Sequence, residues 1–306
     1  DAMPLLEGVA ESAPAKRRWL AWSVAAVFLL AFALLAFLHF LSIPPQALVL
    51  RSYIPPPDKT VFVFESNRGL PALSPDGRHL VFAATTDDGK SQLWVRPLDA
   101  LGAQPLLGTE GAILPFWSPD SRFVGFFADG KLKKIDIAAG SPFTLTNAPE
   151  GRGGTWSPEG VIVFAPSSSG ALQRVSAAGG DPSPATIVDE SKSDNHRAPW
   201  FLPDGKHFIY AAHRREQTPG HSRMLLYVSS LDSKESRAIG EADSNAEYSE
   251  GHLLFLRENS LMAQRFDAKR LVTIGDAAPI AERVKRTFDP SSIGFFSASA
   301  QGLLAY

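Results

Sequence analysis

The sequence predicts an all-β domain of repeated four-stranded units, preceded by one apolar helix that crosses a membrane. Three observations lead to this prediction. A short turn motif recurs six times, an aromatic residue follows each turn at a nearly fixed distance, and 23 residues near the start carry no charge. Equivalent turn positions are 39 to 51 residues apart, which is the length of one blade of a β-propeller. We therefore expect five full blades and the start of a sixth.

The recurring motif has the composition of a tight hairpin turn. Proline presets the first central residue of a β-turn, aspartate hydrogen-bonds its own backbone, and glycine adopts positive φ. The motif and its weaker copies are Ser74-Pro75-Asp76-Gly77, Ser118-Pro119-Asp120-Ser121, Ser157-Pro158-Glu159-Gly160, Leu202-Pro203-Asp204-Gly205, Ser249-Glu250-Gly251 and Ser299-Ala300-Gln301-Gly302. Because Asp76, Asp120 and Asp204 hold the same turn position, we interpret them as turn formers rather than metal ligands.

Each turn is followed by a short apolar run that indicates a buried strand. An aromatic residue lies four or five positions after the shared turn position: Phe82, Phe126, Phe164, Tyr210, Phe255 and Tyr306. Such runs are typical of strands covered by neighbouring sheets on both faces. Third strands are expected at 93–99, 132–136, 172–176, 225–232 and 261–267, and fourth strands at 105–107, 143–145, 186–188, 238–239 and 280–281.

The sixth unit stops at Tyr306, inside its second strand. An open blade leaves unpaired backbone groups at its edge, so we expect an unfinished ring and a chain that is a piece of a longer protein. Residues 49–54 and 60–64 are further strand candidates that can add to the ring.

The apolar stretch from Trp19 to Leu41 is predicted to be a transmembrane helix, since its length spans about 35 Å. Lys16, Arg17 and Arg18 precede it, and the next basic residue after it, Arg51, is distant. The positive-inside rule then places residues 1–18 in the cytoplasm as a juxtamembrane linker and the propeller in the periplasm. A signal peptide would have a shorter apolar core. The expected divisions are 1–18, the helix 19–41, a proline-rich linker 42–60 and the propeller 61–306.

The amino-acid composition excludes several kinds of ligand and metal site. The net charge of −2 gives no basic surface for nucleic acid, so we expect no nucleic-acid partner in this region. The chain has no cysteine, which excludes disulfides and thiolate metal sites. Its seven histidines form no helical metal-binding pair, and we expect neither a metal nor a cofactor.

The repeats resemble the WD40-like, TolB-type β-propeller repeats of bacteria, through the segments Leu73–Arg78, Leu93–Asp99, Pro115–Phe123 and Phe201–Phe208. More narrowly, Ile54–Lys59, Phe126–Lys134 and Gly151–Trp156 resemble the extracytoplasmic half of bacterial membrane-anchored, eukaryotic-like serine/threonine protein kinases. In that family a cytoplasmic kinase domain precedes the membrane helix. The resemblance implies that ATP and magnesium serve only such a domain, upstream of Asp1.

The chain itself carries no catalytic motif. It lacks the phosphate loop, the His-Arg-Asp loop and the Asp-Phe-Gly motif of kinases, and the Gly-x-Ser-x-Gly elbow of hydrolases. The glycines of Gly151–Gly154 precede a strand rather than a helix, so we interpret them as a tight loop between blades. Trp94, Trp117, Trp156 and Trp200 are expected to pack between blades rather than to stack on a ligand.

One group of residues is a candidate ligand- or partner-binding site. Arg152 and Arg197 each lie eight residues before the shared turn position, and Glu110, Glu150 and His196 can join them at one mouth of the channel. Converging loop charges favour a binding site for a peptide, protein or small ligand. The alternative is that these charges are solvated or pair with each other.

These observations favour the sensor or interaction propeller of a single-pass, receptor-like serine/threonine kinase in the inner membrane. Two alternatives remain open: the sensor of a membrane-bound DNA-binding regulator, and a periplasmic scaffold similar to TolB.

Overall fold

The computed structural model describes residues 16–41, 51–63, 70–138, 140–188, 195–213, 224–287 and 292–306. The chain divides into two compact units, Asp1–Ile54 and Pro55–Tyr306. In the first unit, α1 (Lys16–Leu41) is a single helix of 26 residues. Within the part of the chain that the structure describes, no helix combines the length and the apolar character that a membrane crossing requires. The linker residues 42–50 lie outside the described residues.

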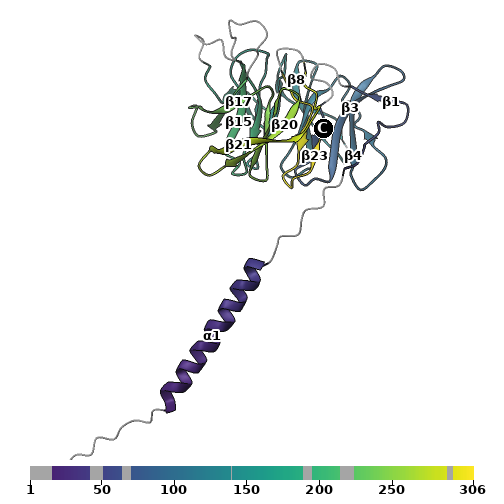
Figure 1. The fold of residues 1–306 in the computed structure, drawn as a ribbon. Helices are drawn as coiled ribbons and strands as arrows, with labels where there is room; N and C mark the ends of the chain where they lie inside the picture. Colours follow the sequence, from purple (N-terminus) through teal and green to yellow (C-terminus); the bar gives the residue numbers. More distant parts are fainter. Residues whose placement is uncertain are drawn as a thin grey trace, which may run out of the picture. The chain divides into compact units, whose positions relative to one another are not determined.

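The second unit is a β-propeller whose sheets follow one another along the chain (Figure 1). Five sheets each contain a full blade, as the repeats predict, and the chain ends in a two-stranded sheet. Blade one contains β1 (Thr60–Phe62), β2 (Ala72–Leu73), β3 (His79–Thr86), β4 (Ser91–Pro97) and β5 (Gln104–Pro105). Blade two contains β6 (Ile113–Trp117), β7 (Phe123–Ala128), β8 (Lys131–Asp136) and β9 (Phe143–Asn147).

The remaining strands continue this order. Blade three contains β10 (Gly154–Trp156), β11 (Val161–Phe164), β12 (Gln173–Ser176) and β13 (Ser183–Pro184). Blade four contains β14 (Asn195–Phe201), β15 (His207–His213), β16 (Met224–Ser230) and β17 (Arg237–Ala242). Blade five contains β18 (Ala246–Ser249), β19 (His252–Arg257), β20 (Ser260–Asp267) and β21 (Val272–Ala281), and the last sheet contains β22 (Ser297–Ala298) and β23 (Leu304–Ala305).

The turn motif joins the first and second strands of every blade and has the predicted geometry. The shared position has positive φ in all six copies, from Gly77 (67°) to Gly302 (80°), and Ser121 adopts it without being glycine (58°). Asp76 Oδ1 accepts from Arg78 N at 3.0 Å, and Asp204 Oδ1 accepts from Lys206 N at 3.0 Å. The interpretation of these aspartates as turn formers is confirmed.

The predicted aromatic residues form the core between blades. They lie on the second strand of each blade, and Phe82, Phe126, Phe164, Tyr210 and Phe255 are each at most 3% exposed. Tyr306 is the exception: it follows β23 and is 58% exposed. It lies just beyond a sheet of only two strands, which gives it less cover than its counterparts have.

The two-stranded sheet lies between blade five and blade one. Strand β22 contacts both β18 and β2. Ser297 Oγ accepts from Leu73 N at 3.0 Å, and Ser249 Oγ donates to the carbonyl of Ser299 at 2.7 Å. The innermost strands of the five blades and of the two-stranded sheet therefore contact their neighbours all around the channel. The ring is closed at this inner layer, which differs from the open ring expected, while the sixth unit has only two strands. The expectation that the chain belongs to a longer protein stays a prediction.

Three strand predictions differ from the structure. The fourth strand of blade three is β13 at Ser183–Pro184 rather than 186–188, because the Thr186 hydroxyl accepts from Leu172 N instead of extending the ladder. The outer strand of blade five, β21, begins eight residues earlier than predicted. Of the early strand candidates, β1 pairs with β3 in blade one, whereas described residues 51–59 form no strand.

Candidate binding site in the central channel

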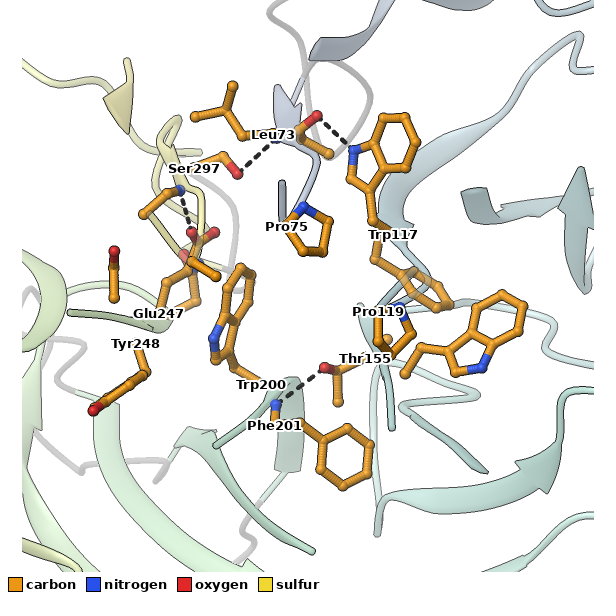
Figure 2. A pocket seen from close by; sticks show the side chains of 18 of the residues that line it. Leu73, Pro75, Trp117, Pro119, Thr155, Trp200, Phe201, Glu247, Tyr248 and Ser297 are labelled. Carbon is orange, nitrogen blue, oxygen red and sulfur yellow. Dashed lines mark hydrogen bonds between the residues drawn. The ribbon is translucent and has the colours of Figure 1, made fainter. Parts of the chain in front are cut away.

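The innermost strands and the turns that follow them enclose a cavity of about 490 Å³ (Figure 2). This volume lies within the range of small-molecule sites, which is roughly 300–1,000 Å³. All six units contribute to the wall. The turns supply Pro75, Pro119, Pro158, Pro203, Glu250 and Ala300. The strands, with Phe296 just before β22, supply a mainly aromatic surface that also includes Phe116, Trp117, Trp156, Trp200, Phe201 and Tyr248.

Hydrogen bonds between neighbouring innermost strands hold this wall together. Thr155 Oγ1 accepts from Phe201 N at 3.0 Å, Glu247 Oε2 from Ala298 N at 2.7 Å, and Ser297 Oγ from Leu73 N at 3.0 Å (Figure 2). Thr155, Glu247 and Ser297 each lie two residues before the serine that begins the turn, so the three bonds are equivalent. The same kind of hydrogen bond thus joins blade three to blade four, blade five to the two-stranded sheet, and that sheet to blade one.

Glu247 differs from the two equivalent residues, because it makes this hydrogen bond with a carboxyl group where they use a hydroxyl group. Its side chain is buried, with the residue only 6% exposed. Burial raises the pKa of Glu247 from 4.5 to about 8, and the hydrogen bond from Ala298 N opposes the shift only in part. The carboxyl group is therefore mainly protonated at neutral pH in the empty cavity.

The tryptophans of the wall connect blades, as predicted. Trp117 Nε1 donates to the carbonyl of Ala72 in blade one at 2.8 Å. The Trp156 ring stacks on Phe123 of blade two, with centroids 6.1 Å apart. Trp117 and Trp156, with Trp200, also line the cavity, so packing between blades and presenting a surface to a ligand are compatible roles.

The structure brings three of the predicted site residues together at the boundary of blades three and four. Glu150 accepts from Ser168 N at 3.2 Å, while Arg197 Nη2 donates to the carbonyl of Ser168 at 3.5 Å. Ala198 N donates to the carbonyl of Arg152 at 2.8 Å. The Ser168 hydrogen bonds, with a smaller contribution from Arg152, lower the pKa of Glu150.

This group lies away from the cavity. Arg152 and Glu150 precede β10, and Arg197 lies near the start of β14, whereas the cavity extends to the turns at the far ends of these strands. The group is therefore toward the opposite end of the channel. Arg197 is 3% exposed and belongs to a strand, which differs from the exposed loop position expected for it. A role of these residues in binding stays a prediction.

The other two predicted site residues do not join the group. His196 is buried, its Nδ1 lies 2.8 Å from Thr186 Oγ1, and its ring centroid is 4.6 Å from that of Tyr210. Burial lowers the pKa of His196 to about 4, so it is a neutral residue of the blade core. Glu110 is exposed on the turn before β6, and the described residues give its side chain no hydrogen bond or ion pair.

The glycines at 151–154 are packing positions. A Cβ on Gly151 would lie 2.1 Å from Phe127 Cδ1 of blade two, and one on Gly153 would lie 2.9 Å from the Cα of Ala198 in blade four. This close approach confirms a tight loop between blades. Among the described residues, no cluster of three or more His, Asp or Glu side chains could hold a metal ion.

The cavity was not predicted as a site. A comparison of the repeats nevertheless marks one residue of the wall. Two positions before the start of the turn motif, the other units have a small, an aromatic or a hydroxyl-bearing residue, and only the fifth unit has an acid. An aligned repeat therefore marks Glu247 as unusual, although only the structure shows that it faces the channel.

Comparisons with known proteins support the fold. No protein-family model matches the chain, and no curated protein matches it. TolB from Acinetobacter baumannii is 13% identical with a TM-score of 0.51, over 70% of this chain and 54% of that chain. A putative TolB from Agrobacterium tumefaciens is 20% identical with a TM-score of 0.47, over 59% of this chain and 68% of that chain.

The β-propeller domain of the Trilobed protease from Pyrococcus furiosus is 20% identical with a TM-score of 0.45, over 71% of each chain. At these identities the likeness concerns the fold alone, and it rests on the Acinetobacter TolB, of which this chain spans about half the length. The second unit is a TolB-like β-propeller.

Proposed function

We propose that this chain is the extracytoplasmic sensor of a single-pass, receptor-like serine/threonine kinase whose catalytic domain precedes residue 1. One observation carries the proposal: a propeller with a ligand-sized channel cavity follows, in one chain, a separate unit whose described residues include the helix α1. A transmembrane receptor needs a binding domain that follows a membrane anchor in the chain, and the proposal assigns the anchor to the uncharged residues 19–41.

The sequence of the helix supports anchorage in the inner membrane. Residues 19–41 carry no formal charge, and three basic residues stand directly before them. In the described part of α1, Trp22, Phe28 and Phe32 are each more than 70% exposed. Exposed aromatic surface of this kind is unfavourable in water, and insertion in a bilayer would remove it from water.

The link to a kinase rests on the resemblance of three segments to kinase-associated propellers, and the TolB-like fold supports a periplasmic scaffold as a second candidate. The two differ in what precedes residue 1. A kinase domain there supports a receptor, a helix-turn-helix domain supports a DNA-binding regulator, and the lack of any effector supports the scaffold.

Topology is the direct test of the shared part of these proposals. A periplasmic reporter fused after Tyr306 should be active, and protease added to spheroplasts should digest the propeller. As a matched control, a variant with Lys16, Arg17 and Arg18 replaced by glutamine should lose this orientation bias. A propeller that stays protected in intact spheroplasts would contradict the sensor proposal. The full chain by itself should not phosphorylate a test protein, since it has no kinase motif.

A further inference from the structure

We propose that the channel cavity binds a small organic cation, an ammonium group carried on an apolar or aromatic body, with the Glu247 carboxylate as its counter-ion. This inference rests on the proposed role of the propeller as a sensor and adds the chemical class of the ligand. It depends on the charge, the shape and the surface chemistry of the wall.

The charge of the wall favours a cation. Among the described residues that line the cavity, Glu247 and Glu250 are the acidic side chains, and there is no lysine, arginine or histidine. Tyr248 is the other titratable side chain there. Glu247 is buried within the wall, whereas Glu250 lies exposed at the turn. An anionic ligand would find no cationic partner in this wall and would oppose ionisation of Glu247, so its binding would be unfavourable.

The apolar part of the wall favours an ammonium group on an organic body over a hydrated metal ion. Trp200 of β14 stands beside Glu247 of the adjacent innermost strand β18, whereas the Tyr248 ring turns away from them and contacts Phe266 (Figure 2). Aromatic faces attract organic cations, and this attraction strengthens when water is excluded. The volume of about 490 Å³ suits a small molecule rather than a folded domain.

The geometry at Glu247 is compatible with a second partner. The carboxyl group already receives one hydrogen bond, from Ala298 N to Oε2. An ionised carboxylate accepts several hydrogen bonds through its two oxygens, so an ammonium group can pair with it without breaking the contact to β22. The structural bond and the ligand contact therefore use the same side chain.

Binding of the ammonium group should release a proton from Glu247, and this release can be measured. In the empty cavity Glu247 holds a proton at neutral pH, since burial raises its pKa to about 8. An ammonium group beside it favours the carboxylate, and the released proton passes to the buffer while the amine keeps its own. No covalent bond forms or breaks apart from this O–H bond. Affinity should therefore rise as pH increases toward 8, by up to about tenfold per unit.

The test is titration calorimetry of the full chain, in non-ionic detergent, with three probes of similar shape: 2-phenylethylammonium, 2-phenylethanol and 3-phenylpropanoate. We expect the ammonium probe to bind about tenfold or more tightly than the alcohol, and the carboxylate to bind most weakly. Titrations in buffers of different ionisation enthalpy should show the release of about one proton with the ammonium probe at pH 7.

Three variants separate recognition from folding. Glu247→Gln keeps an acceptor for Ala298 N, and it should lose about tenfold in affinity for the ammonium probe together with the proton release. Trp200→Leu should weaken binding but leave the proton release unchanged. Glu159→Gln is the matched control, since Glu159 is exposed at the equivalent turn position of blade three and does not line the cavity, and it should change the affinity less than about threefold.

Equal affinity for the alcohol and the ammonium probe, binding by wild type without proton release, or no ammonium binding at about 10 mM would each overturn the inference. These outcomes need no variant, so they hold even if a substitution prevents folding. Failure of the sensor proposal is distinguishable: the cation would bind, yet it would not change the activity of the effector in the parent protein.

Discussion

Replacing Glu247 with glutamine should change how the stability of the propeller depends on pH. Burial raises the pKa of Glu247 from 4.5 to about 8, so the folded state keeps a proton that the unfolded chain releases. The associated stability is fully present below pH 4.5 and is lost as the pH rises toward 8. The slope is about 1.4 kcal/mol per pH unit for one proton.

The interval from pH 6.5 to 8 isolates this effect from that of His196. Burial lowers the pKa of His196 from 6.5 to about 4, so its contribution is lost only as the pH falls below 6.5. The two groups have opposite signs and offset each other between about pH 4.5 and 6.5. Above that range, the wild-type free energy of unfolding should fall by about 2 kcal/mol, and that of Glu247→Gln should stay nearly constant.

Urea unfolding followed by tryptophan fluorescence at pH 6.5, 7.2 and 8.0, at constant ionic strength, measures this difference. The amide oxygen of the variant still accepts from Ala298 N, so the fold and the m-value should be retained. Glu250→Gln alters an exposed carboxylate on the adjoining turn and should keep the wild-type pH dependence. An equal fall in stability for wild type and Glu247→Gln would refute the assignment of a buried, protonated carboxyl group.

Two further predictions concern stability. Gly205→Ala should destabilise the propeller by about 2 kcal/mol, because φ is 67° and the new Cβ would lie 2.8 Å from Pro158 Cδ. Gly89 also has a positive φ, of 80°, but open space surrounds it, so Gly89→Ala should destabilise the propeller by only about 1 kcal/mol. Arg197→Ala should cost about 1–3 kcal/mol because the side chain is buried, and Arg152→Ala, which is half-buried, should cost less than about 1 kcal/mol. Thermal or urea unfolding checks both pairs, and equal losses within either pair would contradict the reasoning.

The sequence predicts the blades well because the chemistry of the turn motif is local. Proline, aspartate and glycine fix a turn through their own φ values and hydrogen bonds, whatever surrounds them. Gly77 and Gly205 therefore have the predicted positive φ, and the strands begin beside them. The outermost strands are less predictable, since each depends on pairing with a single neighbour. In blade three, the Thr186 hydroxyl bonds to Leu172 N at the place where a strand was expected.

The candidate site shows where sequence reasoning fails. His196 and Arg197 are adjacent in sequence, yet successive side chains of a strand point to opposite faces. His196 contacts Thr186 and the Tyr210 ring, whereas Arg197 reaches Ser168. Sequence proximity placed both at the channel mouth, although neither lines the cavity. The cavity itself requires six segments, spread from Leu70 to Ala300, to meet around one axis, and no local pattern contains that information.

The choice of glutamate at position 247 is the strongest reason to assign a ligand to this cavity. Thr155 and Ser297 make the equivalent bond to the next innermost strand with a hydroxyl group. A hydroxyl satisfies the backbone N–H without the desolvation that a buried carboxyl group suffers. Closure of the ring therefore does not require an acid at this position, and the acid destabilises the fold near neutral pH. Glu247 therefore lowers the stability of the fold and lies on the wall of a cavity. Residues with these two properties are expected in binding sites.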